Sequence, residues 1–445
     1  MRIIIAGAGE VGTHLAKLLS RENMDITLLD ESQERLGMLE TTYDIMERLG
    51  NATSLHDLEG VGVKDADLFI AVTPEETTNL TACILANQLG AKKTLARIDN
   101  YEYLLPENRP IFNNLGLTHL IYPEVLAANE ICESLKTNWL RYHISLCDDA
   151  LELCVVKVYD GAPVIGHAFE SGYFSHGRYR VVAIKRESRT LIPTGQDTIE
   201  PGDLAYVVCI RDEMKFMREQ FGKTEREIKN VFFIGGSRIA QKAVQQLPSS
   251  VNIKIFEPNK DICYRLSEKL ERALIINGDA GDMEMLREEG IQDADAVVAV
   301  ADKSEANIFA CLAAKRFGIR KTIAEVENID YIPMAEGLDI GTVLNKKMIT
   351  ASYIYQLLLD ASVLNVRNLT NADAQVVEFR AMPGSRITRG KIRNMRFPKN
   401  VNIGGIVRAG EGILVNGDTQ IMENDKVVVF CKSDVIRQLD KFFKE

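Results

Sequence analysis

Short apolar runs alternate with amphipathic stretches along the first part of the chain. The run Ile3–Ala8 leads into a glycine turn, and apolar positions then recur at helical spacing. The stretch DITLLD, residues 25–30, forms the next apolar run. Alternation of short strands with helical patterns is typical of a parallel sheet covered by helices. The pattern therefore predicts an α/β domain at the start of the chain.

The same pattern occurs twice, at a constant offset of 228 residues. Residues 3–19 correspond to residues 231–247, and residues 65–100 correspond to residues 293–328. A later match, at an offset of 222, joins two stretches of Val- and Ile-rich strands with Gly, Pro and Asp turns. These ungapped matches indicate a duplication. We therefore predict an α/β protein with two tandem Rossmann-like parallel-sheet domains, each followed by a small β-rich α+β domain.

The repeat also suggests where the domains begin and end, and 445 residues exceed what a single ordinary core holds. We expect nucleotide-binding domains at 1–120 and 229–345, small C-terminal domains at 146–222 and 367–445, and linking helices at 121–145 and 346–366. Helical spacing shows an apolar stripe on each linking helix and not its partner. It leaves open whether these stripes are covered in the core or pair two subunits.

Three glycines and an acid in the first copy have the spacing of a nucleotide site. Gly7, Gly9 and Gly12 form G-x-G-x-x-G between a predicted strand and a predicted helix. They permit a tight turn, a close backbone approach to pyrophosphate and helix–sheet packing, and the helix N-terminus attracts phosphate. Asp30 ends the next strand, where a carboxylate accepts from ribose hydroxyls. The pattern favours NAD over NADP and does not separate NAD from ATP, ADP or AMP.

A further turn in the first copy carries the signals of a helix start. In AVTPEETTNL, residues 71–80, we expect Thr73 to cap the helix, Pro74 to take its first position and Glu76 to complete a capping box. Helix capping accounts for the whole stretch. The turn nevertheless falls at the carboxyl end of a strand, where open α/β sheets bind ligands.

Other strand ends offer two further candidate contacts. Arg97 follows one strand and could fork onto phosphate oxygens, and a surface ion pair is the alternative interpretation of its position. Asn51 and Ala52 form another turn and could face an adenine, or be a plain turn. Asp279 takes the position of Asn51 in the second copy.

The second copy differs from the first at four of these positions. Its second and third glycines are replaced by Ser237 and Ala240, the ribose acid by Glu257, and the arginine by Glu325. The acid survives, whereas Glu325 reverses the charge where phosphate would lie. We therefore expect the second site to bind nucleotide more weakly, or to prefer a less charged ligand.

Composition narrows the function further. The net charge of −10 argues against nucleic acid and against direct binding to anionic lipid. The eight cysteines form no C-x-x-C pair, which favours reduced thiols in a cytoplasmic protein and no metal site. The first apolar run is too short for a signal peptide, and no run reaches the ~18 residues of a membrane span, so we expect no direct membrane insertion.

No group of residues has the arrangement of a catalytic site. All six histidines precede residue 177 and have no counterpart in the second copy, and no nucleophile, zinc or P-loop motif occurs. We therefore predict no catalytic residues and no enzyme. One basic run, residues 385–400, is either a solvated loop or a docking surface for an anionic partner.

Together these motifs resemble the TrkA family of Trk potassium uptake proteins, built from two tandem RCK (KTN) domains. The resemblance rests on GAGEVG with Asp30, GNAT, AVTPEETTNL and ARIDN, on their echoes in the second copy, and on the paired β modules. It implies a nucleotide-binding regulatory subunit on the cytoplasmic face of the cell membrane. It further implies a homotetrameric ring, a TrkH- or TrkG-like potassium-translocating partner, and NAD(H), ATP or ADP as ligands.

The resemblance also implies which residues contact nucleotide. In the first copy they are Gly7, Ala8, Gly9, Glu10, Val11, Asp30, Thr73, Pro74 and Arg97. In the second copy they are Gly235, Gly236, Ser237, Arg238, Ile239, Glu257, Ala301 and Asp302. A soluble NAD-dependent dehydrogenase with a duplicated fold, and a regulator of another cation transporter, remain alternatives.

Overall fold

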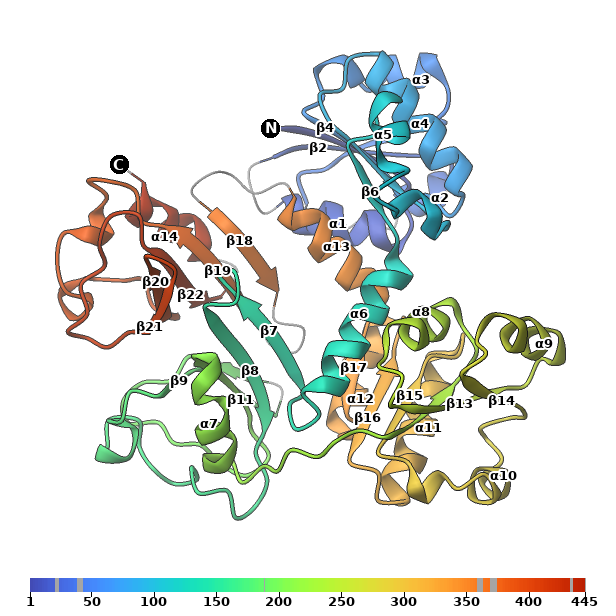
Figure 1. The fold of residues 1–445 in the computed structure, drawn as a ribbon. Coiled ribbons are helices and arrows are strands. Elements are labelled where there is room, and N and C mark those ends of the chain that lie inside the picture. The colour runs from blue at the N-terminus through green and yellow to red at the C-terminus, as the bar shows by residue number, and fades with distance from the viewer. Residues whose placement is uncertain are drawn as a thin grey trace. The chain divides into compact units, whose positions relative to one another are not determined.

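The structure is a computed structural model that describes residues 1–20, 24–37, 43–187, 189–357, 363–368, 374–432 and 435–444. Its contacts divide the chain into two compact units. One unit comprises Met1–Ala127 and Asn345–Leu358, and the other Ala128–Leu344 and Leu359–Glu445. Figure 1 shows the elements of both.

A six-stranded parallel sheet forms the centre of the first unit, with the strand order β3-β2-β1-β4-β5-β6. Its strands are β1 (Arg2–Ala6), β2 (Asp25–Asp30), β3 (Met46–Leu49), β4 (Leu68–Ala71), β5 (Thr94–Arg97) and β6 (His119–Ile121). Central strands such as β1 and β4 are apolar and buried because helices cover both faces. This is the doubly wound order of Rossmann domains, which bind ligands at the carboxyl ends of the strands.

Helices connect and cover these strands. They are α1 (Glu10–Ser20), α2 (Gln33–Leu36), α3 (Leu55–Gly60), α4 (Glu76–Gln88) and α5 (Arg109–Asn114). A further helix of this unit, α13 (Lys346–Gln356), comes from far along the chain and packs against α1. Its Ala351 and Ile354 are fully buried. The apolar stripe of this linking segment is therefore covered within the chain.

The second unit contains a parallel sheet of the same order, β14-β13-β12-β15-β16-β17. Its strands are β12 (Asn230–Ile234), β13 (Asn252–Glu257), β14 (Ala273–Asn277), β15 (Ala296–Ala299), β16 (Lys321–Glu325) and β17 (Thr342–Leu344). Its helices are α8 (Arg238–Gln246), α9 (Lys260–Lys269), α10 (Met283–Glu288), α11 (Ser304–Arg316) and α12 (Ile332–Gly337). The identical order confirms the predicted duplication.

Two antiparallel sheets form the small domains of the second unit, in equivalent orders β10-β9-β11-β8-β7 and β21-β20-β22-β19-β18. The first contains β7 (Tyr142–Leu146), β8 (Leu151–Lys157), β9 (Tyr179–Arg186), β10 (Arg189–Leu191) and β11 (Leu204–Cys209), with helix α7 (Met214–Gln220). The other contains β18 (Val363–Asn368), β19 (Gln375–Arg380), β20 (Val401–Arg408), β21 (Glu411–Leu414) and β22 (Lys426–Cys431), with helix α14 (Ile436–Phe443). These confirm the predicted β-rich α+β domains.

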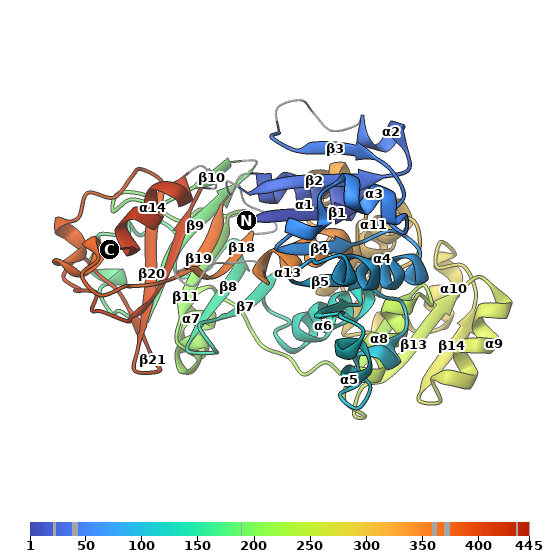
Figure 2. The same cartoon turned by 90° about the horizontal axis from the view of Figure 1, so that it is seen from above.

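The two small domains share one hydrophobic core and lie side by side in Figures 1 and 2. Leu153 and Tyr206 of the first sheet join Val428 and Phe430 of the second in this core. Arg180 donates to Asn402 across the same interface at 3.0 Å. The two sheets therefore stabilise each other by burying their apolar faces.

The linking segments are shorter than expected. Helix α6 (Pro123–Lys136) is followed by strand β7 within the expected 121–145 segment. The expected 346–366 segment holds α13 and the start of β18, and its residues 358–362 lie outside the described residues. In the second unit, Cys132 of α6 lies 3.7 Å from the Ala243 carbonyl of α8. Both helices therefore bury their stripes on neighbouring elements of their units, which favours the core interpretation.

All eight cysteines are buried and none forms a disulfide. Burial raises the pKa of the Cys132 thiol to about 11 and of Cys311 to about 12. This agrees with inert, reduced thiols. No helix within the described ranges is both long and apolar enough to cross a bilayer.

Candidate nucleotide-binding sites

The first glycine of each copy adopts a conformation that other residues avoid. Gly7 has φ +111° and its N–H donates to the Leu29 carbonyl at 2.8 Å. Gly235 has φ +97° and donates to the Phe256 carbonyl at 2.8 Å. Each link ties the glycine turn to the neighbouring strand. The predicted tight turn is therefore present in both copies.

The other two glycines of the first copy differ in what surrounds them. A Cβ atom at Gly9 would meet nothing within 4 Å, so its backbone faces open space. A Cβ atom at Gly12 would lie 1.9 Å from the Gly7 carbonyl oxygen. Gly12 thus lets α1 approach the turn, and Gly9 leaves room for a ligand beside it. Both features fit a pyrophosphate cradle.

Asp30, at the end of β2, holds the glycine turn in place. Its Oδ2 accepts the Ala8 N–H at 2.6 Å, and its Oδ1 accepts the Ser32 N–H at 2.8 Å. The side chain is buried, and Arg35 lies 3.8 Å from Oδ2. A carboxylate offers about four acceptor positions, so lone pairs remain for ribose hydroxyls. Asp30 is therefore both a brace for the turn and a candidate ribose ligand.

Glu257 repeats this arrangement in the second copy. Its Oε2 accepts the Gly236 N–H at 2.8 Å, and its Oε1 accepts the Asn259 N–H at 2.9 Å. The start of the following helix differs, because the Ser237 hydroxyl accepts the Ala240 N–H at 3.4 Å. That N–H is one of those a phosphate would use at a helix N-terminus. The second turn therefore keeps the ribose acid and offers less to a phosphate.

A buried asparagine braces the facing turn in each copy, and sequence reasoning missed its role. Asn79 Oδ1 accepts the Thr73 N–H at 2.8 Å, and its Nδ2 donates to the carbonyls of Thr73 and Arg97, both at 3.0 Å. Asn307 makes the same three bonds to Ala301 and Glu325. The equivalence of the two asparagines in the repeat was the available signal.

The expected cap at Thr73 and the expected first helical position at Pro74 are both wrong. Helix α4 begins at Glu76, and its N-cap is Glu75. The Thr73 hydroxyl donates to Asn79 Oδ1 at 2.8 Å, so it caps no helix. Glu76 closes no capping box and accepts the Asn100 N–H at 2.7 Å. The capping pattern assumed that the N–H and hydroxyl of Thr73 were free to bond within the first turn. The side-chain amide of Asn79 takes both of these groups instead.

A cavity of about 350 Å³ lies at the carboxyl ends of β1, β2, β3 and β4 in the first unit. Seven of the predicted residues line it: Gly7, Gly9, Asp30, Asn51, Ala52, Thr73 and Pro74. Arg35 is its basic lining residue among those described, and the sequence interpretation did not include it. Arg35 stands on the short helix after Asp30, which was the available signal.

The other predicted residues of the first copy lie outside this lining. The Glu10 carboxylate pairs with Lys347, and Val11 and Gly12 belong to α1. Arg97 lies 3.7 Å from Asp99, and its buried Nε has no hydrogen-bond partner among the described residues. Asn51, which does line the cavity, also shapes its own turn, because its Oδ1 accepts the Thr53 N–H at 2.6 Å.

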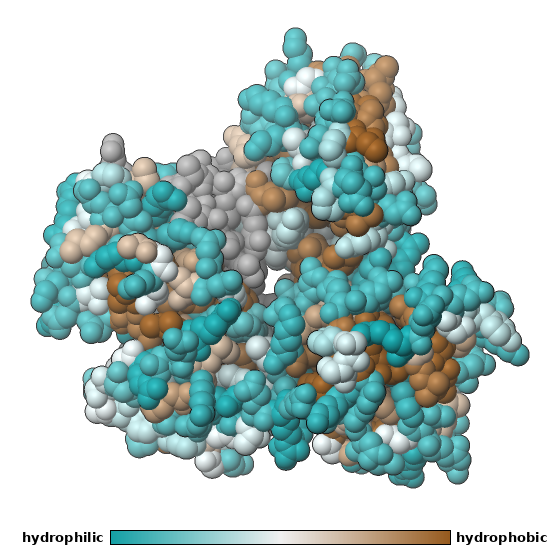
Figure 3. Space-filling model, in the orientation of Figure 1, coloured by the Kyte–Doolittle hydropathy of each residue, from teal (hydrophilic) through white to brown (hydrophobic). Residues whose placement is uncertain are grey.

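A larger cavity, about 950 Å³, occupies the equivalent place in the second unit. The predicted residues that line it are Gly235, Gly236, Ser237, Glu257, Asp279, Ala301 and Asp302. Its remaining wall includes Phe309, Leu312 and Met283, and Figure 3 shows hydrophobic surface on the visible face of this domain. Arg238 lines a smaller neighbouring cavity, and Ile239 is buried in α8. The second cavity is therefore roomier and more apolar.

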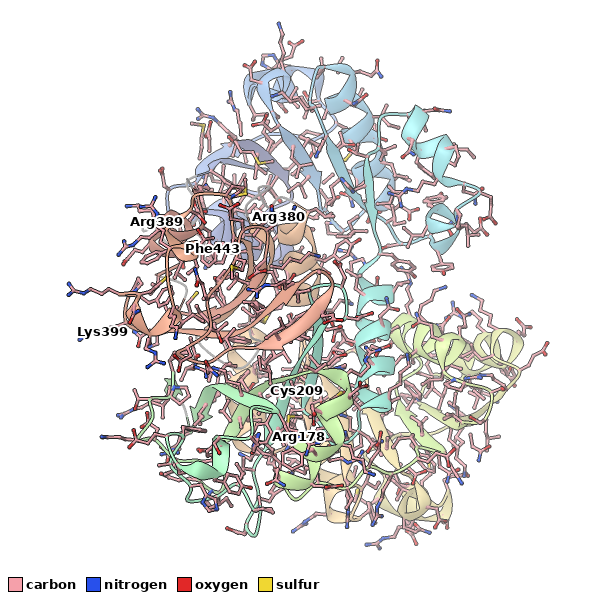
Figure 4. The ribbon with its side chains drawn as sticks, turned by 60° about the vertical axis from the view of Figure 1, so that its left-hand side comes forward. Arg178, Cys209, Arg380, Arg389, Lys399 and Phe443 are labelled. Atoms are coloured by element: carbon pink, nitrogen blue, oxygen red, sulfur yellow. The ribbon has the colours of Figure 1, made fainter. Side chains whose placement is uncertain are left out.

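The basic run of the last domain is partly neutralised. Lys391 and Arg393 both pair with Asp418, and the Arg386 guanidinium lies 4.4 Å from the centre of the Phe442 ring. Figure 4 shows Arg389 and Lys399 projecting outward from this domain. The run therefore combines neutralised cations with outward-pointing ones.

Two known domain families match the domains of this chain. The TrkA-N domain family matches residues 3–123 and 231–346, and the TrkA-C domain family matches residues 153–222 and 376–444. The chain is thus a tandem array of two TrkA-N and two TrkA-C domains, with a glycine turn and an acid in each TrkA-N domain.

Full-length relatives define the family more closely. The chain is 31% identical to the Trk system potassium uptake protein TrkA of Haemophilus influenzae, covering all of this chain and 99% of the relative. It is 31% identical to TrkA of Vibrio alginolyticus, covering 97% and 95%. The chain belongs to the TrkA family of Trk system potassium uptake proteins.

Solved structures share the fold. The GsuK RCK domain superposes with a TM-score of 0.58 at 16% identity, covering 99% of this chain and 94% of that one. The GsuK channel bound to NAD has the same TM-score and identity and covers 99% and 78%. At this identity the likeness establishes an RCK-type fold.

Proposed function

We propose that the chain is the regulatory subunit of a potassium uptake system and gates a membrane transporter in response to bound nucleotide. The observation that carries the proposal is the pair of cavities at the carboxyl ends of two Rossmann-type sheets, each with an acid that braces a glycine turn. Membership of the TrkA family supports the link to potassium uptake.

The first cavity is proposed to bind NAD(H), ATP or ADP. Asp30 would accept from the adenosine ribose, the turn at Gly7 and Gly9 would take the phosphates, and the Arg35 guanidinium would lie near the adenine. The partnerless Nε of Arg97 supports a role toward phosphate. In Arg97→Ala we expect weaker ATP and ADP binding with unchanged adenosine binding, and equal losses for all three would refute this role.

The second cavity is proposed to take a less charged or more apolar ligand. The Ser237 cap takes up an N–H that a phosphate would use, and the apolar wall of the cavity supports the preference. Glu325 lies buried at the end of β16, outside the lining, and would add negative charge behind it. Titration calorimetry of Asp30→Asn and Glu257→Gln variants would assign each ligand to its site.

The partner is proposed to be a TrkH- or TrkG-like potassium-translocating protein, contacted by a homotetramer on its cytoplasmic side. A ligand shifts such an assembly only by its difference in affinity between two shapes, and tenfold discrimination per site supplies about 1.4 kcal/mol. The free energies from several sites on one assembly would add, and together they would shift it almost entirely to one shape. The ligand would leave chemically unaltered.

Potassium flux in proteoliposomes tests this function. The partner would be reconstituted with and without this protein, and flux measured with ATP, ADP, NADH or no nucleotide. We expect flux to depend on both the protein and the nucleotide. Flux that ignores either, or turnover of NADH by the protein, would refute the proposal.

A further inference from the structure

A third cavity lies in the second unit, away from both glycine turns. It has a volume of about 540 Å³ and is lined by the segment after α6, the end of β8, the segment before β12, and the elements around the end of α11. Seven of its described lining residues are basic and one, Asp295, is acidic. In a chain of net charge −10, this concentration of positive charge requires an explanation.

The nearby carboxylates do not neutralise the cavity. Asp295 accepts the backbone N–H groups of Lys229 and Asn230 at 2.8 and 2.9 Å. Asp339 pairs with Arg141 and also accepts the Tyr159 hydroxyl at 3.3 Å. Each of these acids therefore already has partners. Of the seven basic side chains, Arg141 alone pairs with a carboxylate among the described residues, and Lys157 donates to the uncharged Gly202 carbonyl at 2.5 Å.

Several of these cations have no carboxylate partner among the described residues. Lys223 Nζ lies 3.9 Å from the centre of the Tyr159 ring, and Lys315 and Arg320 form no ion pair with any residue that the structure describes. The first copy differs, because Lys92, the counterpart of Arg320, pairs with Asp67 at 2.7 Å. The positive charge at this position is thus neutralised by a carboxylate in the first copy and not among the described residues of the second.

Lys321 is the most buried of the group. The residue is 4% exposed, and its Nζ donates to the Leu140 carbonyl at 3.0 Å and to the Thr342 hydroxyl at 3.3 Å, both uncharged. Burial lowers the pKa of Lys321 well below its usual value, and Arg141 and Lys315 lower it further. Burial also lowers the pKa of Lys223 to about 8. The cavity therefore holds positive charge at a cost to stability.

We propose that this cavity binds a small anion that carries two or more phosphate groups. Lysine and arginine are the side chains that bind phosphate, as point charges and as forks. One carboxylate or one sulfate would leave most of the positive charge unneutralised, whereas a diphosphate or triphosphate moiety would offset several charges at once. The volume falls in the range of small-molecule sites. The cavity is separate from the two nucleotide cavities and shares no residue with them.

The chain supplies its own probe for this site. Trp139 is the one tryptophan of the sequence, and it lines the cavity. Tryptophan fluorescence of the full-length protein would be titrated with inorganic pyrophosphate and tripolyphosphate, and with sodium chloride at matched ionic strength. We expect a saturable change with the polyphosphates and none with chloride. No saturable change, or an equal response to chloride, would overturn the proposal.

Matched variants separate this site from general charge effects. In Lys315→Gln and Arg320→Gln we expect polyphosphate affinity to fall ~10-fold or more, because each removes a charged contact. Lys215→Gln removes an exposed charge of α7 outside the cavity and should leave affinity unchanged. Asp30→Asn with Glu257→Gln should also leave the response intact. Equal affinity in Lys315→Gln, or loss in the last pair, would overturn the assignment.

A second readout guards against misfolding of the variants. Polyphosphate should raise the melting temperature of the wild-type protein and of Lys215→Gln, and not that of Lys315→Gln. Without ligand, Lys315→Gln should melt at or above the wild-type temperature, because a repulsive charge is removed. A polyphosphate-induced rise that persists in Lys315→Gln would contradict the site.

Discussion

Asp30→Asn tests whether the Asp30 carboxylate stabilises the glycine turn through its hydrogen bonds or only by filling space, because the amide has nearly the same shape. The carboxylate accepts one backbone N–H on each oxygen, from Ala8 at 2.6 Å and from Ser32 at 2.8 Å. An amide of the same shape keeps one acceptor oxygen and places an NH₂ group against the other N–H. One buried donor therefore loses its partner and faces another donor.

The expected magnitude follows from those two bonds. Loss of a charge-assisted hydrogen bond costs about 1.5–3 kcal/mol, and an unsatisfied buried donor adds about 1–3 kcal/mol. Allowing for overlap between these terms, we expect Asp30→Asn to lower the free energy of unfolding of the first domain by about 2–4 kcal/mol. Affinity for an adenine nucleotide should fall ~10- to 100-fold, because the ribose loses a charged acceptor.

Titration calorimetry with ADP and with NADH measures the affinity, and urea unfolding measures the stability. Glu34→Gln removes an exposed acid of α2 and serves as the matched control, with both quantities unchanged. Glu257→Gln removes the equivalent brace of the second copy and should leave first-site binding intact. Affinity for ADP within about twofold of wild type in Asp30→Asn would refute the role of the carboxylate.

Four further substitutions test other parts of the account. Asn79→Ala removes three bonds from a buried side chain to partly buried backbone groups and should cost about 2–4 kcal/mol in urea unfolding. Gly12→Ala places a Cβ atom 1.9 Å from the Gly7 oxygen and should cost ~3 kcal/mol or more, whereas Ala240→Gly should cost only about 1 kcal/mol, both measured by thermal melting. Lys223→Met in phosphate-free buffer should stabilise the protein by about 1–2 kcal/mol near pH ~7, after allowance for partial exposure, and by less near pH ~10.

The sign of the last effect follows from the direction of the shift. Lys223 has its pKa lowered from 10.5 to about 8, so its charge destabilises the folded state fully below pH 8. This penalty fades as the pH rises from about 8 to about 10.5. A stabilisation that is constant across this window would contradict the account. For Asn79→Ala and Gly12→Ala, a free energy of unfolding equal to that of the wild-type protein would contradict the account.

The fold was largely predictable because the same pattern occurs twice, so each copy supports the interpretation of the other. A pattern of strand, glycine turn and helix that recurs at a constant offset leaves little freedom in topology, and both sheets have the expected order. The glycine turn and its acid were predictable for the same reason. Gly7 and Asp30 occupy positions that backbone geometry and ribose chemistry define.

What the sequence could not supply were the long-range partners. Helix α13 shows an apolar stripe, and only the structure places that stripe on α1. The Thr73 cap failed because Asn79 reaches the same groups from one turn along α4. The basic cavity gathers Arg141, Lys223 and Lys315 from three distant segments, and none of these segments is a motif by itself.

The most direct test of the central claim is the nucleotide dependence of potassium flux in reconstituted vesicles, compared between the wild-type protein, Asp30→Asn and Glu34→Gln. The account predicts that Asp30→Asn shifts the half-effective ADP or NADH concentration upward ~10-fold or more, while Glu34→Gln leaves it unchanged. An unshifted response in Asp30→Asn, with protein still bound to the vesicles, would contradict regulation through the cavity at the Gly7 turn.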